Sequence, residues 1–252
     1  MKMLWYRAGE IGSDGMGDAR FVEYLMHFGV TRQEALVYWT LLVKGKQTGY
    51  EVAKEAGISR SNAYSSLAGL VEKGAAYLVE ESAKRYIPVA LEEFCENCIR
   101  RMKAEEDWMV KNLPVEPVEE EGYITIEGEG NIEDKIRNLL MSVRERVYIS
   151  CSVQILRKFE GETKRLAAAG KKVVVITDGE YFMDGATVYV TGDKGWQIGL
   201  ITDSKYVLSG EYGAGSLNTC LYSGQNNFVM VFKTALANEI KLIEMRKGEK
   251  QR

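Results

Sequence analysis

The chain has 252 residues, of which 46% are hydrophobic and 27% are charged, and its net charge is −3. This composition is typical of a soluble globular protein with room for two domains. The sequence has no apolar run of the roughly 18 residues that a membrane helix needs, and we expect no secretory leader, because its first residues lack a long apolar stretch. Four cysteines are too few for a secreted disulfide framework, so we expect a cytoplasmic protein.

Helix start signals dominate the N-terminal part of the chain. Residues 1–18 are rich in glycine, and we expect them to form a flexible extension. Residues 31–34 (Thr-Arg-Gln-Glu) and 48–51 (Thr-Gly-Tyr-Glu) each have the spacing of a capping box, in which the threonine caps a helix and the glutamate reaches back. Ser59 is an N-cap candidate for a third helix.

The third helix would bury one apolar stripe and leave polar residues outward near its N-terminus. In a helix-turn-helix, this part of the second paired helix meets base edges in the major groove. Arginine suits guanine, asparagine suits adenine, and serine suits a base or a phosphate. The competing interpretation is a polar, solvated helix start. The predicted DNA contacts here are Thr48, Ser59, Arg60, Ser61, Asn62, Tyr64 and Ser65.

A strand, a turn and a second strand follow at residues 75–87, which is the order of a wing. Lys84 and Arg85 would lie beside phosphates or in the minor groove, although two glutamates in the turn oppose that contact. Nine basic and seven acidic residues lie within residues 20–90, so we expect DNA binding to depend on local placement of charge and on dimerisation. Residues 19–90 are therefore predicted to form a winged helix-turn-helix domain that binds double-stranded operator DNA.

Residues 91–113 have the pattern of one continuous linker helix. Its apolar residues repeat at spacings of four and three, which is a heptad seam that needs a partner, so we expect a homodimer. The seam residues are Leu91, Cys95, Cys98, Met102 and Met109. Cys95 and Cys98 also have the spacing of a metal or redox pair, but a lone pair falls short of a tetrahedral zinc site. We expect no metal and no cofactor, with redox sensing as a minor alternative. Residues 114–122 are acidic, contain proline and read as an interdomain linker.

The wording of the N-terminal module resembles the TrmB family, whose members are regulators often tied to sugar-uptake operons. The resemblance is carried by FGVTRQEALVYWTLL (28–42), YEVAKEAGISRSNAY (50–64), LVEKG (70–74) and KRYIPVALEEF (84–94). Pro88 is displaced from its usual place in the last of these motifs. The resemblance implies a DNA-binding transcriptional regulator that responds to a small-molecule effector, with a sugar as the candidate.

From residue 123 the pattern alternates strand and helix. Strand-like runs at 123–126, 147–151 and 173–176 alternate with helical runs at 131–146 and 155–169, and a long helix closes the domain. We expect a two-domain chain in which an α/β domain at 123–247, with cover on both sheet faces, follows the α+β winged module. The layout resembles half of a phospholipase D-like fold, which the TrmB family commonly carries.

The resemblance also implies that the chemistry of phospholipase D-like enzymes is lost. Those enzymes use a histidine and a lysine in H-x-K-x-x-x-x-D. When Asp203 is aligned with the motif's aspartate, Trp196 stands at the histidine and Ile198 at the lysine, so neither nucleophile nor phosphate clamp is present. We expect Asp203 to be a structural residue and the chain not to be an enzyme. The alternatives are a phospholipase D-like phosphodiesterase and a DNA-binding scaffold without a ligand.

The former cleft is a candidate effector site for a neutral polyol, because aromatic rings stack on sugar faces and carboxylates accept hydroxyl hydrogens. The competing interpretation is that the tryptophan packs in the core and the acids are solvated loop residues. The candidate residues are Asp178, Glu180, Trp196, Glu211 and Tyr212.

Overall fold

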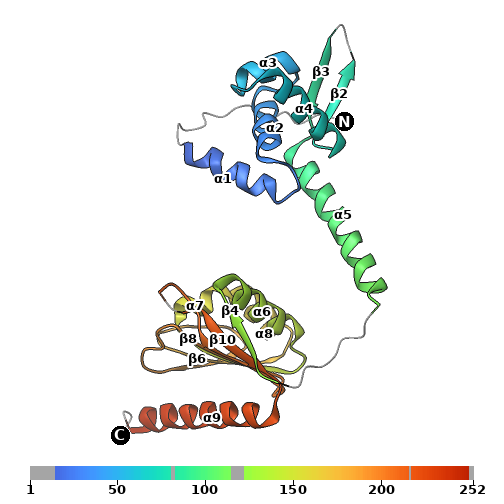
Figure 1. Cartoon of the computed structure of the whole chain (residues 1–252). Helices are drawn as coiled ribbons and strands as arrows, with labels where there is room; N and C mark the ends of the chain where they lie inside the picture. The colour runs from blue at the N-terminus through green and yellow to red at the C-terminus, as the bar shows by residue number, and fades with distance from the viewer. Residues whose placement is uncertain (1–14, 81–82, 115–121, 216, 250–252) are drawn as a thin grey trace. The chain divides into compact units, whose positions relative to one another are not determined.

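A computed structural model describes residues 15–80, 83–114, 122–215 and 217–249 (Figure 1). The chain divides into two compact units, Met1–Glu116 and Pro117–Arg252, and each is described by itself. Most of the expected N-terminal extension and of the expected linker, and the tip of the wing at 81–82, lie outside the described residues.

The first unit is a helical module with a small sheet. Its elements are α1 (Gly15–Met26), α2 (Arg32–Lys44), β1 (Gln47–Thr48), α3 (Gly49–Glu55), α4 (Arg60–Glu72), β2 (Ala76–Glu80), β3 (Lys84–Pro88) and α5 (Leu91–Asn112). The strands pair in the order β1-β3-β2. Both capping boxes form, at Thr31 and at Thr48, and the Ser59 side chain caps α4, so these three predictions are confirmed. Residues 15–18, expected in the extension, instead form the first turn of α1.

The core of this unit surrounds Tyr38, which is fully buried. Its hydroxyl donates a hydrogen bond to the Val89 carbonyl at 2.7 Å, and its ring meets Phe94 of α5 edge-on with centroids 5.5 Å apart. These contacts fix the first turns of α5 against α2 and correct part of the predicted seam. Cys98 is buried, and Leu91 and Cys95 pack against the same core, so these three residues contact their own chain.

The second unit is an α/β domain. Its elements are β4 (Ile124–Glu127), α6 (Glu129–Ser142), β5 (Arg146–Cys151), α7 (Val153–Lys158), α8 (Glu160–Ala168), β6 (Lys172–Thr177), β7 (Ala186–Val190), β8 (Gln197–Thr202), β9 (Tyr206–Glu211), β10 (Thr219–Ser223) and α9 (Asn226–Glu249). They build a seven-stranded sheet in the order β4-β10-β9-β8-β5-β6-β7. Strands β5, β6 and β7 run parallel, and the other neighbours are antiparallel.

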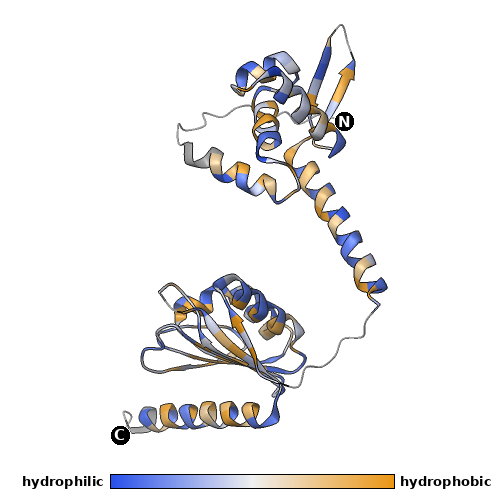
Figure 2. Ribbon diagram, in the orientation of Figure 1, coloured by the Kyte–Doolittle hydropathy of each residue, from blue (hydrophilic) through white to orange (hydrophobic). Residues whose placement is uncertain are grey.

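Helices cover both faces of this sheet, which confirms the expected fold class. Figure 1 shows α6, α7 and α8 over one face and α9 along the other. The larger apolar cluster lies under α6, α7 and α8, and a smaller one joins Ile201 and Val207 to Val229 of α9. Hydrophobic and hydrophilic residues alternate along both α5 and α9 (Figure 2). Among the described residues, no helix has the length and apolarity to cross a membrane.

Candidate nucleic-acid interface

Helix α4 separates a buried face from a polar face. Ala63, Leu67 and Leu70 are fully buried against α2 and α3, because they recur at helical spacing. The residues predicted to meet DNA lie outside this stripe and are exposed: Ser59, Arg60, Ser61, Asn62, Tyr64 and Ser65. The structure therefore brings this part of the predicted set together on the first turns of one exposed helix.

Arg60 is held by an aromatic residue that the sequence reasoning missed. Its guanidinium carbon lies 4.5 Å from the centre of the Tyr50 ring of α3, and Tyr50 is 51% exposed. A guanidinium stacked on a ring keeps its N–H fork available for an acceptor such as the edge of guanine. The available signal was that Tyr50 lies beside Val52 and Ala53 on a short helix but outside their buried pair.

Two of the predicted contacts have a local structural role. The Thr48 hydroxyl donates to Glu51 Oε2 at 2.9 Å while it accepts from the Glu51 N–H, so it is not a free donor for DNA. Tyr64 lies across Gly49 so closely that a methyl group at residue 49 would overlap its ring. Thr48 is therefore corrected to a capping residue, and Tyr64 sets the approach of α3 to α4 while 46% of it stays exposed.

The wing presents one exposed and one half-buried basic residue. Lys84 is exposed and lies opposite Glu80 in the register of β2 and β3. Arg85 is half-buried, and its Nη1 lies 3.9 Å from Glu51 Oε2 on α3. Because a nearby carboxylate already compensates Arg85, Lys84 is the better candidate for a phosphate contact.

A partly buried ion pair braces α4 against α2. Lys73 Nζ, just beyond α4, donates to Glu34 Oε2 at 2.5 Å, and only 10% of the Glu34 side chain is exposed. Burial by itself would raise the pKa of Glu34, but hydrogen bonds from Lys73 and Thr31 outweigh it and hold the pKa below its ordinary value. Gly69 permits the close approach, since a methyl group there would overlap the Glu34 carboxylate.

In the second unit, Trp196 and Tyr212 of the predicted effector set are adjacent, since the Tyr212 backbone N–H donates to the Trp196 carbonyl at 2.8 Å, but Tyr212 and Asp178 are engaged in structural contacts. Tyr212 is fully buried, and its hydroxyl donates to Glu133 Oε2 at 2.9 Å and accepts from Lys158 Nζ at 3.1 Å. Asp178 accepts the backbone N–H of Val153 at 3.0 Å. Both residues are therefore corrected to structural roles.

The rest of that set gives no better site. Trp196 is half-buried against the large core, where Gly213 lies too close to its ring for a side chain at residue 213. Glu180 and Glu211 are exposed. The competing interpretation, in which the tryptophan packs and these acids are solvated, describes the structure better than a polyol site.

Asp203 has the structural role that we expected. Its carboxylate accepts the backbone N–H groups of residues 144, 145 and 146 at 2.8–3.0 Å, and this fixes the entry to β5. Burial alone would raise the pKa of Asp203, but these three donors lower it overall. Ile198, at the position of the enzymes' lysine, is buried in the core.

Comparison with known proteins gives a family for the N-terminal module. Residues 25–92 match the family model described as sugar-specific transcriptional regulator TrmB. The chain is 26% identical over 244 residues to the uncharacterized protein YrhO of Bacillus subtilis (strain 168), which covers 91% of this chain and 88% of YrhO. It is 28% identical over 153 residues to the HTH-type sugar sensing transcriptional regulator TrmBL1 of Pyrococcus furiosus, which covers 58% of this chain and 44% of TrmBL1.

Solved structures include similar but distant chains. TrmBL2, an archaeal chromatin protein, is 19% identical, with a TM-score of 0.39 over 88% of this chain and 97% of its own. NucT from Helicobacter pylori is 16% identical, with a TM-score of 0.38 over 48% of this chain and 96% of its own. Similarity this low says nothing about activity. The sequence match, together with the capped helices and the wing, places residues 25–92 in the TrmB family of transcriptional regulators.

Proposed function

We propose that this chain is a sequence-specific, DNA-binding transcriptional regulator. The observation that carries the proposal is the exposed N-terminal face of α4, where Arg60, Ser61 and Asn62 stand free of the core and Arg60 lies over the Tyr50 ring. The first turns of α4 would enter the major groove, with Arg60 reading a base edge and Lys84 of the wing on a neighbouring phosphate. A DNA-binding regulator works where the chromosome is, so the cytoplasm is the proposed location.

A second copy of the chain would supply the affinity that one weakly basic module lacks. Beyond Cys98, α5 and the residue that follows it carry an exposed apolar strip with spacings of three, seven and four. Its members are Ile99 (57% exposed), Met102 (47%), Met109 (58%) and Leu113 (61%). Met102 and Met109 of the predicted seam belong to this strip, and Ile99 takes the place of Cys98. We assign it to a two-chain coiled coil.

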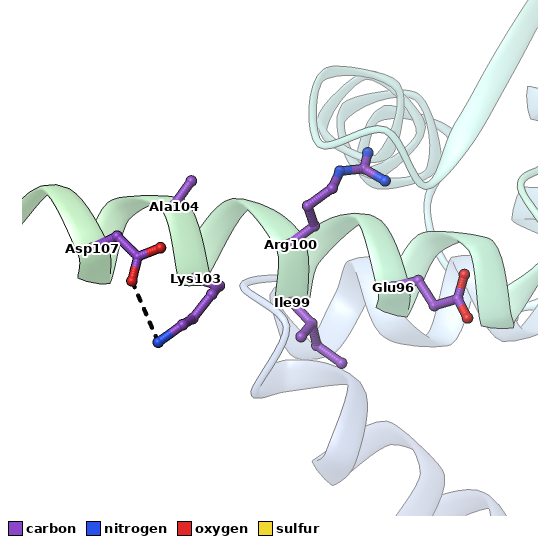
Figure 3. A pocket seen from close by; sticks show the side chains of 6 residues that line it. All are labelled: Glu96, Ile99, Arg100, Lys103, Ala104 and Asp107. Atoms are coloured by element: carbon purple, nitrogen blue, oxygen red, sulfur yellow. Dashed lines mark ion pairs between the residues drawn. The ribbon is translucent and has the colours of Figure 1, made fainter.

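The face beside this strip supports a helical partner. Figure 3 shows Glu96, Arg100, Lys103 and Asp107 along α5, with two basic side chains flanked by two acidic ones. They border an open hollow of about 500 Å³ next to Ile99. Charges of both signs beside an apolar strip are what a second, identical helix can complement. The expected target is an inverted repeat with half-sites about one helical turn apart.

The second unit is proposed to lack phosphodiesterase activity and to serve regulation. Trp196 cannot take a phosphoryl group, and Ile198 is a buried apolar residue. Turnover of bis(p-nitrophenyl) phosphate by the purified chain, abolished by a substitution in this unit, would support the phosphodiesterase alternative. Thermal stabilisation by metabolites would separate an effector-responsive regulator from a scaffold without a ligand.

DNA-binding affinity is measured by fluorescence-anisotropy titration at fixed salt. One duplex carries the sequence that the wild-type chain selects from a random library (the selected DNA), and the other carries the same bases in scrambled order. The proposal expects the wild-type chain to prefer the selected sequence and Arg60→Ala to lose that preference. Arg157→Ala, which changes net charge equally from an exposed position in the second unit, is the matched control and should keep it. Equal affinity of the wild type for both DNAs would refute sequence-specific binding.

A further inference from the structure

A hollow of about 410 Å³ lies between α9 and the sheet, within the range of small-molecule sites. It is on the sheet face opposite α6, α7 and α8, the face along which α9 runs in Figure 1. None of its lining residues belongs to the effector set expected from the sequence.

The floor of the hollow is a single row of residues across four strands. In the sheet register Ile201 pairs with Tyr148, and Val174 pairs with Thr187. Tyr148 also pairs with Val174, which joins the two pairs into one row from β8 to β7. Paired residues of neighbouring strands point to the same face, so their side chains form one continuous surface. That surface is mostly apolar.

The wall of the hollow is one stripe of α9. Leu236, Ala237 and Ile240 line the hollow, with Lys233 one turn before them and Lys241 directly after. These residues are spaced i, i+3, i+4, i+7 and i+8, so they lie on one helix face. Eight residues along a helix span about 12 Å, so the two lysines bracket the apolar wall at its ends.

A third lysine comes from the sheet. Lys172 begins β6 and also lines the hollow, with its Nζ 5.9 Å from the centre of the Tyr148 ring. In the part of the chain that the structure describes, no acidic residue lines the hollow. The carboxylates nearby in the α9 sequence are engaged: Glu239 pairs with Lys194, and Glu244 accepts from the Tyr189 hydroxyl at 3.2 Å. The hollow therefore combines an apolar interior with a surplus of positive charge.

We propose that this hollow is the binding site of a small amphipathic carboxylate. Its hydrocarbon part would cover the row from Ile201 to Thr187, and its carboxylate would bind Lys233 or Lys241 in a charge-assisted hydrogen bond, with Lys172 adding to the positive field. A neutral sugar would leave this charge unused, and a bare inorganic anion would leave the apolar floor uncovered. The proposed binding of a carboxylate in this hollow does not depend on the proposed DNA-binding function.

Isothermal titration calorimetry of the full-length chain with decanoate tests the site. Decanoate is expected to bind one site per chain, whereas decanol and acetate, which each carry half of the chemistry, should bind at least about tenfold more weakly. Equal binding of decanol would refute the role of the lysines. Equal binding of acetate would refute the role of the floor. Binding to phosphatidylglycerol vesicles without binding of free decanoate would overturn the proposal in favour of a membrane surface.

Two variants locate the site. Lys233→Gln combined with Lys241→Gln should weaken decanoate binding by about tenfold or more, and Lys164→Gln, on α8 of the opposite face, should leave it unchanged. Ala237→Trp would fill the hollow from its wall and should abolish binding while the far-ultraviolet spectrum stays that of the wild type. Undiminished binding by either pocket variant would overturn the assignment. A wild-type chain that binds decanoate but does not bind DNA would refute only the proposed function.

Discussion

The guanidinium of Arg60 on α4 lies over the ring of Tyr50 on α3, with its central carbon 4.5 Å from the ring centre. The pair joins the two helices of the helix-turn-helix on their exposed side. A side chain that already lies in one orientation loses less conformational entropy when it binds. In the proposed DNA complex, Tyr50 would therefore orient Arg60 toward a base edge without having to contact the DNA itself.

Replacing Tyr50 tests this relationship. Tyr50→Ala removes the ring and should weaken binding to selected DNA by about 0.5–1 kcal/mol, the usual contribution of an exposed cation–π contact. Tyr50→Phe keeps the ring and should bind like the wild type. Anisotropy titration at constant salt measures both. If Tyr50→Phe is as weak as Tyr50→Ala, the hydroxyl itself contacts DNA and the positioning role is wrong.

Substitutions of Arg60 and Lys84 should change DNA binding in different ways. Arg60→Ala is expected to cost about 1–3 kcal/mol on selected DNA and to relax preference at one base pair. Lys84→Ala should weaken all sequences alike and reduce the slope of log affinity against log salt by about one, because a phosphate contact releases counterions. Titrations over several salt concentrations, with the selected sequence and with single-base variants, separate the two effects. Unchanged affinity for Arg60→Ala would remove it from the recognition surface.

Local signals account for most of what the sequence revealed correctly. The capping boxes at residues 31–34 and 48–51 are each complete within four residues, so no distant contact is needed to recognise them. Asp203 was predicted as a structural residue from its place in the aligned motif, and in the structure its carboxylate accepts backbone N–H groups at the entry to β5.

The misplaced residues depend on contacts that are distant in sequence. Helix α5 has two overlapping apolar strips, and only the packing of Phe94 on Tyr38 decides that Cys98 faces inward while Ile99 is exposed. Tyr212 looked like a cleft residue, but its polar end finds partners in Lys158 and Glu133 under α6 and α7. The row beneath α9 exists only through strand register, which a single sequence does not specify.

The ion pair between Glu34 and Lys73 should make the first unit sensitive to acid. The folded-state pKa of Glu34 is lowered, so its contribution to stability is fully present above its unfolded pKa, about 4.3, and is lost as pH falls through the lower folded pKa. Lys73→Met removes the donor and should shift this loss to higher pH. It should also cost about 1.5–3 kcal/mol at neutral pH, since it leaves the Glu34 carboxylate poorly paired.

Urea unfolding monitored by tryptophan fluorescence between neutral pH and pH 3 measures this effect. Glu34→Gln combined with Lys73→Met should be less destabilised than the sum of the two single variants, because no unpaired charge remains. Additive losses, or a pH profile that Lys73→Met leaves unchanged, would contradict the coupling.

The strip on α5 predicts a specific response in assembly. Met102→Lys places a charge in the proposed two-chain seam and should lower dimerisation and operator affinity together, at a cost of several kcal/mol if the charge is unpaired. Trp108→Lys, on another face of the same helix and 67% exposed, introduces the same charge and should leave both unchanged. Sedimentation equilibrium and anisotropy on the same samples test this. A monomeric wild type that binds a full operator tightly would refute the seam.

Selection of bound fragments from a random duplex library tests whether α4 reads DNA sequence in two copies. We expect enrichment of an inverted repeat with half-sites about one helical turn apart, and loss of one conserved base pair per half-site when Arg60→Ala is used instead. Recovery of fragments with no common sequence by the wild-type chain would contradict this expectation.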